Sequence, residues 1–152
     1  VPIPERPEPM EIGRGQVLEP GERVALVGYG YGAVLAREAA DLVAEGLGTR
    51  PTVVNARFAK PIDAALMREL AGRHELIVTI EDHAQMGGFG TAVLECLDDA
   101  PVRVLRVGIP DRFIDHGKRE ILLEDAGLTA PQIAARTIRA AGRSARVVLT
   151  EG

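Results

Sequence analysis

Short apolar runs alternate along the chain with longer segments in which apolar residues recur every three or four positions. Continuous short runs are typical of strands buried on both faces, whereas the longer repeat is typical of helices with one apolar side. The predicted strands are residues 15–18, 23–28, 52–56, 75–81 and 102–108. The first predicted helix follows the second strand and ends at Gly46 and Gly48, since glycine is favoured just beyond a helix end. The later predicted helices are residues 64–74, 91–99, 118–127 and 130–142.

This alternation of strands and helices predicts an α/β fold. Strands that alternate with helices at this spacing form βαβ units, which build a mostly parallel sheet with helices on both faces. Pro20 and Gly21 stand where a type II turn favours them, so local pairing predicts a hairpin between strands 15–18 and 23–28. Asp63 is placed to cap the helix at 64–74, directly after the helix-breaking Pro61.

Length and composition bound the organisation of the chain. With 152 residues it is long enough for one domain and too short for two ordinary ones. Four prolines in the first nine residues predict an extended interdomain linker over 1–13, and the chain starts with Val1, so we expect a piece of a larger protein. The domain is predicted over 14–142. The tail, 143–152, fits no element clearly, and disorder is one interpretation of it.

Charge and cysteine content exclude several classes of protein. A net charge of −4 argues against a nucleic-acid partner. The sequence contains no run of eighteen apolar residues, so it predicts no membrane-spanning segment. The single cysteine, Cys96, cannot form an internal disulfide, and the scattered histidines have no metal-ligand spacing, so we expect no metal site and a reducing, cytoplasmic setting.

Arginines recur at helical spacing near the end of the chain: Arg136, Arg139, Arg143 and Arg146. No acidic residue lies between Asp125 and Glu151. A solvated helix face is the favoured interpretation, because few aromatic or exposed apolar residues accompany the arginines. A stripe that binds phosphate or membrane is the alternative.

A glycine-rich turn between the second strand and the first helix raises the question of a nucleotide site. Its glycines are Gly28, Gly30 and Gly32, so the spacing differs from the G-x-G-x-x-G of dinucleotide-binding loops. The next strand ends in Asn55-Ala56-Arg57 and offers no carboxylate for a ribose. We therefore interpret the glycines as a device for a tight turn and close helix packing.

Three motifs resemble a known family. "VVNARFAKPID", "VTIEDHAQMGGFGTAVLE" and "GIPDRFIDHG…AGL" are similar to the C-terminal domain of 1-deoxy-D-xylulose-5-phosphate synthases, which are transketolase-type enzymes. The resemblance covers roughly residues 14–142, and the first motif is its most specific part. The acid pair and the "GGFG" turn are also shared with pyruvate dehydrogenase beta subunits.

The resemblance implies a particular sheet and a particular reaction. It implies a three-layer α/β/α fold with five strands in the order 1-3-2-4-5, the first strand being antiparallel at the edge. The implied reaction joins pyruvate and D-glyceraldehyde 3-phosphate into 1-deoxy-D-xylulose 5-phosphate with loss of carbon dioxide, in the isoprenoid precursor pathway. Thiamine diphosphate and Mg²⁺ are implied as cofactors held by other domains. The Gly-Asp-Gly motif that holds them in the family is missing from these residues.

We therefore expect no catalytic, cofactor-binding or metal-binding residue in this chain. We expect it instead to support assembly of the enzyme, by contact with the enzyme's N-terminal domains and with a second copy in a homodimer. Arg57 is long enough to reach Glu81, Asp82 or a neighbouring domain. Aromatic residues beside acids on loops favour an interface over free solvent. The candidate domain-interface residues are Tyr29, Tyr31, Arg57, Glu81, Asp82, His83, Met86 and Phe89.

Other interpretations remain open on the sequence. Within the superfamily, the equivalent domain of a 2-oxoacid dehydrogenase beta subunit is the alternative. Outside the superfamily, two alternatives are open. One is a free-standing NADP-binding module in which Arg57 contacts the 2′-phosphate, and the other is an independent interaction domain. For the cluster of Glu81, Asp82 and His83, a structural or interface network is favoured over catalysis.

Overall fold

The computed structural model describes residues 9–148, with side-chain surroundings up to residue 142. These residues form five strands and five helices, as the sequence pattern predicts. The strands are β1 (Gln16–Glu19), β2 (Val24–Tyr29), β3 (Thr52–Asn55), β4 (Leu76–Ala84) and β5 (Arg103–Ile109). The helices are α1 (Gly32–Leu47), α2 (Ala64–Arg73), α3 (Phe89–Cys96), α4 (Arg119–Asp125) and α5 (Ala130–Val148).

All five strands form one sheet in the order β1-β3-β2-β4-β5. β1 pairs antiparallel with β3, and the remaining pairs are parallel. The order and the antiparallel edge strand implied by the family resemblance are therefore confirmed. The predicted hairpin between β1 and β2 is wrong, because both edges of β2 are occupied by β3 and β4.

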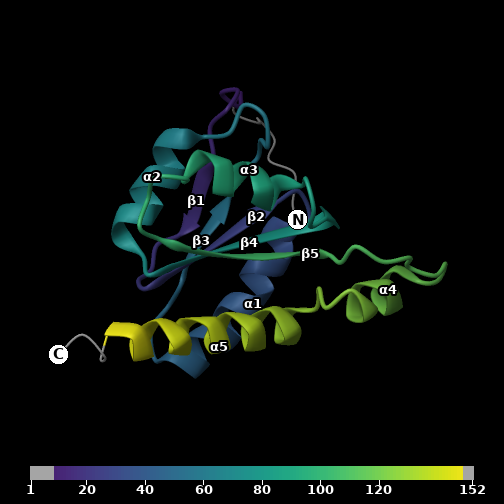
Figure 1. Ribbon diagram of the computed structural model, residues 1–152. Helices are drawn as coiled ribbons and strands as arrows, with labels where there is room; N and C mark the ends of the chain where they lie inside the picture. The colour runs from purple at the N-terminus through teal and green to yellow at the C-terminus, as the bar shows by residue number, and fades with distance from the viewer. Residues whose placement is uncertain (1–8, 149–152) are drawn as a thin grey trace.

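Helices cover both faces of the sheet, so the molecule has three layers (Figure 1). In β2, Val24 and Leu26 pack into the core beneath α1 and α5, whereas Ala25 and Val27 pack into the core beneath α2 and α3. Side chains alternate between the two faces of a strand, so a central strand with a core on each side must be apolar throughout. This requirement explains why the strands of the sheet's centre are continuous apolar runs.

Several element boundaries differ from the prediction. β4 continues to Ala84, and α3 begins at Phe89, two residues earlier than its predicted start at 91. α5 runs to Val148, past its predicted end at residue 142. The parts of the predicted linker and tail at residues 1–8 and 149–152 lie outside the described residues.

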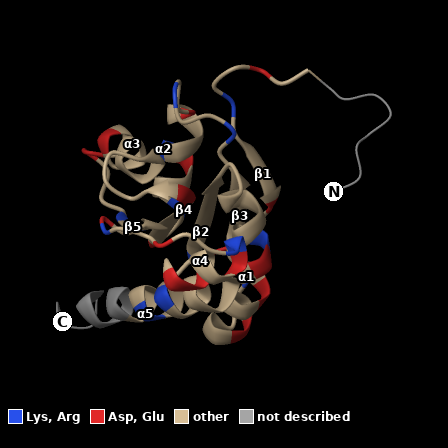
Figure 2. Cartoon of the chain, turned by 90° about the vertical axis from the view of Figure 1, so that its right-hand side faces the viewer, with Lys and Arg blue, Asp and Glu red and all other residues tan. Residues whose placement is uncertain are grey.

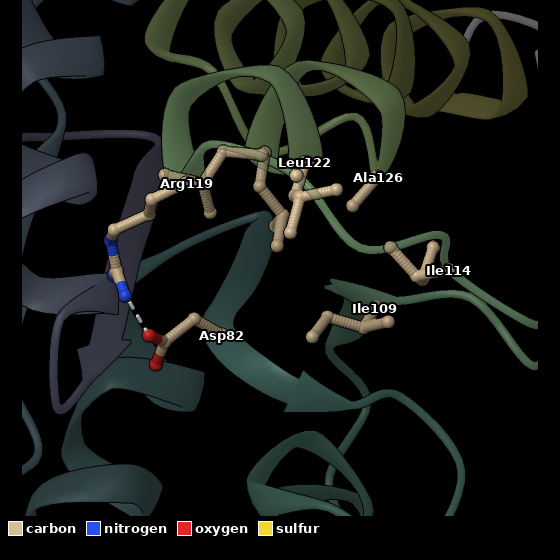
Figure 3. A pocket seen from close by; sticks show the side chains of 9 residues that line it. Asp82, Ile109, Ile114, Arg119, Leu122 and Ala126 are labelled. Carbon is tan, nitrogen blue, oxygen red and sulfur yellow. Dashed lines mark hydrogen bonds and ion pairs between the residues drawn. The ribbon is translucent and has the colours of Figure 1, made fainter.

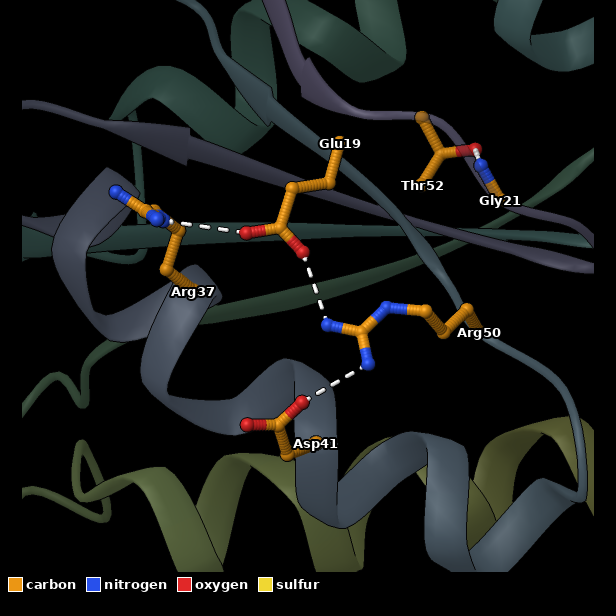
Figure 4. A network of polar contacts seen from close by, with 6 residues as sticks. All are labelled: Glu19, Gly21, Arg37, Asp41, Arg50 and Thr52. Carbon is orange, nitrogen blue, oxygen red and sulfur yellow. Dashed lines mark hydrogen bonds and ion pairs between the residues drawn. The ribbon is translucent and has the colours of Figure 1, made fainter.

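Edge strand β1 is tied to the body of the domain by a network of charged side chains (Figure 4). Glu19 accepts hydrogen bonds from Arg37 at 3.2 Å and from Arg50 at 3.1 Å, and Arg50 also donates to Asp41 at 3.0 Å. These bonds to Glu19 and Asp41 raise the pKa of Arg50 above its ordinary value. The same mixing of acidic and basic residues is visible along α1 (Figure 2). Single exposed pairs contribute little, but the network links β1, α1 and the approach to β3.

Asp63 caps α2, as predicted. Its Oδ1 accepts a hydrogen bond from the Leu66 N–H at 3.0 Å, and its Oδ2 accepts one from the Gly15 N–H at 3.0 Å. The second bond, which the sequence did not predict, fastens the segment before β1 to the start of α2. Asp63 is buried, and both bonds lie at a partly buried junction of the two segments.

We expect Asp63→Ala to lower the free energy of unfolding by about 2 kcal/mol, from the lost cap and the unpaired Gly15 amide together. Asp63→Asn is the matched control, because its amide oxygen can still accept from Leu66, and it should lose about half as much. Urea denaturation of the three proteins measures the difference. Equal stability of the alanine variant and the parent would contradict the capping role.

Candidate functional site

The loops after β2 and β4 meet at the carboxyl end of the sheet. These strands are neighbours, and Tyr29 lies beside Glu81 in their register. The chain leaves β2 for α1 on one face and leaves β4 for α3 on the other, as the two core clusters show. A place where neighbouring strands lead to helices on opposite faces is called a topological switch point. It is the usual ligand or contact site of an open α/β sheet. The two loops therefore lie side by side at this edge of the sheet.

Glycines bring α1 close against the sheet at this point. A Cβ on Gly32 would overlap the carbonyl oxygen of Ile80, so the first residue of α1 must lack a side chain. Gly30 has φ 58°, in the left-handed region that glycine adopts without strain. The glycine loop is therefore needed for backbone geometry, as the sequence analysis proposed.

Glu81 is a buried cap for α3. Its side chain is only 1% exposed, and its two carboxylate oxygens accept hydrogen bonds from the N–H groups of Phe89 at 2.7 Å and Gly90 at 2.8 Å. These are free amides of the first turn of α3, where a negative charge is also favoured by the helix dipole. The structure therefore differs from the prediction that Glu81 is an interface residue, because its carboxylate bonds within the domain and is not presented to a partner.

An aromatic cluster lies beside this cap. The Tyr29 ring stacks on Phe89 with 5.3 Å between centroids, and it lies 5.9 Å from the ring of His83. Phe89 is only 2% exposed, so it too belongs to the interior and not to the predicted interface surface. Tyr29 is half-buried, whereas His83 and Met86 are exposed.

Arg119 joins the two loops from α4. It donates a hydrogen bond to Asp82 Oδ2 at 3.0 Å, and its guanidinium lies 4.3 Å from the centroid of the Tyr31 ring. Arg119 is not among the candidate residues that the sequence indicates. The available signal was topological: Asp82 lies near the end of β4 and Arg119 follows β5, its parallel neighbour, so both lie toward the carboxyl edge of the sheet.

An apolar pocket of about 370 Å³ lies behind this ion pair (Figure 3). Its walls are aliphatic, and Asp82 with Arg119 is the charged part of its lining. Ile109 comes from β5, Leu122 from α4 and Ile114 from the loop between them. The other lining residues are Gly117, Leu123, Ala126 and Leu128. Next to the pocket, Phe113 is fully exposed, so this corner carries uncovered apolar surface.

Arg57 points elsewhere. Its guanidinium donates to Gln16 Oε1 at 2.6 Å on β1, and its backbone N–H donates to Asn55 Oδ1. It contacts neither Glu81 nor Asp82 within the described residues, so the expected reach to these acids is wrong. Arg57 is half-buried beside the edge strand.

His74 has a structural role. Its Nδ1 lies 2.9 Å from the carbonyl oxygen of Leu70 and its Nε2 lies 2.8 Å from Thr52 Oγ1. Because a carbonyl only accepts, Nδ1 carries a proton. In residues 9–142 no group of three or more His, Cys, Asp or Glu side chains could hold a metal ion. No helix among the described residues is long and apolar enough to cross a membrane.

The family of the chain follows from sequence comparison. Residues 13–133 match the family described as "Transketolase, C-terminal domain", so the chain belongs to that family. Among solved structures, it is similar to a chain of a split-gene transketolase described as an inactive β4 tetramer. The TM-score is 0.76 at 39% identity, and the match covers 87% of this chain and 42% of that one.

Proteins similar to this chain include 1-deoxy-D-xylulose-5-phosphate synthases. The chain is 46% identical over 151 residues to the chloroplastic synthase 1 of Cannabis sativa. This match covers 95% of this chain and 21% of that protein. It is 44% identical over 140 residues to the synthase of Thermomicrobium roseum, covering 91% of this chain and 22% of that protein. The chain thus spans about a fifth of the length of these relatives, and the predicted resemblance to this family is confirmed.

Proposed function

We propose that this chain is the C-terminal, non-catalytic domain of a 1-deoxy-D-xylulose-5-phosphate synthase. The observation that carries the proposal is the 46% identity over nearly the whole chain to a synthase of which it covers only 21%. A domain of this size therefore works together with the other four fifths of such a protein.

The reaction that we infer for the complete protein converts pyruvate and D-glyceraldehyde 3-phosphate into 1-deoxy-D-xylulose 5-phosphate and carbon dioxide. Thiamine diphosphate, bound with Mg²⁺ on other domains, supplies the carbon nucleophile when present. The 152 residues contain no Gly-Asp-Gly motif, which supports placing this cofactor outside the chain. The described residues contribute rigid support: α1 and α3 are seated on the sheet through Gly32 and Glu81.

The surface that we propose for contact with the N-terminal domains, or with a second copy in a homodimer, is the switch-point surface. We define it as Tyr29, Tyr31, Asp82, His83, Met86 and Arg119. Arg119 and Asp82 hold the two loops in one arrangement, while Tyr31 and Met86 leave apolar area exposed. An apolar centre with charged neighbours is the composition of a protein interface. A cytoplasmic setting remains part of this proposal.

A comparison of the isolated chain with the complete protein tests the proposal. With pyruvate, D-glyceraldehyde 3-phosphate, thiamine diphosphate and Mg²⁺, the isolated chain should release no carbon dioxide above background, whereas the complete protein should form the sugar phosphate. Hydrogen exchange should show the backbone amides of residues 29–31 and 81–89 better protected in the complete protein than in the isolated chain. The amides of residues 24–27 in β2, buried in both samples, are the internal control.

Two results would count against the proposal in separable ways. Carbon dioxide release by the isolated chain would place catalysis here and refute its non-catalytic role. Equal protection of both loops in the two samples would leave the enzyme assignment intact and refute the interface.

A further inference from the structure

An apolar groove with acidic residues at its rim lies at the amino end of the edge strand β5. It has a volume of about 700 Å³ and runs between the end of α3 and the start of β5. We call it the acidic groove: its rim residues are Glu95 and Asp98, and its apolar lining is Leu94, Leu97, Ala100, Val102 and Val104. The switch-point surface lies at the other, carboxyl end of the strands, so the two surfaces are separate.

The carboxylates of the acidic groove are unpaired. Glu95 and Asp98 are exposed, and neither has a basic partner or a side-chain hydrogen bond within residues 9–142. Leu94 beside them is 38% exposed, so uncovered apolar area adjoins the two charges. An arginine side chain matches this combination, because it has an aliphatic stem and a cationic tip that binds carboxylates.

Helix α5 carries arginines that lack such partners. Arg136 is half-buried and donates to the carbonyl oxygen of Arg106 at 3.1 Å, whereas Arg139 is exposed. Neither has an acidic partner in the described part of the chain. Burial, together with the positive charge of Arg139, lowers the pKa of Arg136 below its ordinary value. Carboxylates placed beside these two arginines would offset both effects.

Within one chain the acidic groove and these arginines are kept apart by β5. Val104 packs with the core beneath α3, whereas its neighbour Leu105 packs with the core beneath α5. Successive side chains of a strand point to opposite faces, so the two charged regions lie on opposite sides of the sheet. Because β5 is the last strand of the sheet among the described residues, a second molecule has access to both regions at this edge.

We propose that two copies of this chain associate along β5, with Arg136 and Arg139 of each copy lying in the acidic groove of the other. A two-fold axis along this edge produces both contacts together, since every contact between two residues is repeated with the copies exchanged. The arginine stems cover the apolar lining, and the guanidinium groups bond to Glu95 and Asp98. The proposal is independent of the enzyme assignment, and the contact leaves the switch-point surface available to other domains.

Sedimentation velocity of the 152-residue chain and of two charge-reversal variants tests this contact. The parent should form a dimer with a dissociation constant in the micromolar range. Glu95→Arg and Arg139→Glu each bring like charges together, so each variant alone should dimerise about tenfold more weakly or worse. An equimolar mixture of the two variants should recover most of the parent's affinity, because each groove in the mixed dimer meets opposite charge.

A third charge reversal is the matched control. Arg37 is an exposed arginine that pairs with Glu19 on β1, at the opposite edge of the sheet. Arg37→Glu should therefore dimerise like the parent. Glu95, Arg139 and Arg37 are all exposed, so the three variants should keep the circular dichroism spectrum of the parent.

Four results would overturn the proposal. A parent chain that stays monomeric at millimolar concentration would refute the self-association. A mixture that associates no better than the two single variants would refute the pairing of the groove with α5. An equal loss in Arg37→Glu and Arg139→Glu would show a general effect of charge. Growth beyond the dimer would refute the two-fold arrangement, because only a closed pair uses up both contacts.

Discussion

Replacing Gly32 with alanine is expected to lower the free energy of unfolding by about 3 kcal/mol or more, because a Cβ there collides with backbone. The added carbon would overlap the carbonyl oxygen of Ile80 in β4. No side-chain rotation relieves this overlap, so α1 must move away from the sheet or β4 must bend. Either movement opens the core between α1 and β4, where Leu35 and Ile80 are buried. Chemical denaturation monitored by circular dichroism measures the loss.

Gly72→Ala is the matched control for this prediction. Gly72 lies in α2, and a Cβ on it would meet no atom within 4 Å. Alanine is favoured over glycine in a helix by about 0.5–1 kcal/mol, so this variant should be slightly more stable than the parent. Opposite signs for the two substitutions would establish that close packing, and not glycine content, decides the outcome. A Gly32→Ala variant as stable as the parent would show that α1 is free to shift.

The sequence predicts the central part of the fold well because the physical signal there is strong. β2 and the first part of β4 are buried on both faces, so nearly all of their residues are apolar, and the runs are visible without alignment. β1 is different. It is a short edge strand that is largely exposed, and its nearest neighbour in sequence, β2, has no free edge. Local turn chemistry at Pro20 and Gly21 cannot show that β3, more than thirty residues away, offers the open edge.

The candidate site was predicted only in part, for a related reason. The loops at Tyr29 and Glu81 could be placed together because they follow neighbouring strands of the sheet order implied by the resemblance. Which of their side chains turn inward depends on three-dimensional packing. The sequence places Glu81 among the candidate interface residues because it is an acid beside loop aromatics, but the first turn of α3 satisfies both of its oxygens. Arg119 and Asp82 are 37 residues apart in the sequence, and a helix or strand repeat cannot predict a contact over that separation.

The burial of Glu81 leads to the second large expected effect. Its carboxylate pairs two backbone amides of α3, and both bonds are out of reach of water. In Glu81→Gln one amide oxygen remains to accept, while the new NH₂ group faces an N–H that it cannot pair. An unpaired buried donor costs about 1–3 kcal/mol, and the loss of a negative charge at the helix start adds to it. We therefore expect a total loss of about 2–3 kcal/mol.

A local measurement separates this capping role from a general loss of packing. In Glu81→Gln, hydrogen exchange of the Phe89 and Gly90 amides should accelerate more than exchange in β2, because the substitution frees those two groups directly. Glu95→Gln, at an exposed position of the same helix, removes an equal charge and should change stability by less than about 0.5 kcal/mol. If Glu81→Gln left the exchange of Phe89 and Gly90 unchanged, the start of α3 would be held by its apolar contacts, with Val93 and Leu97 in the core, and the carboxylate would be dispensable.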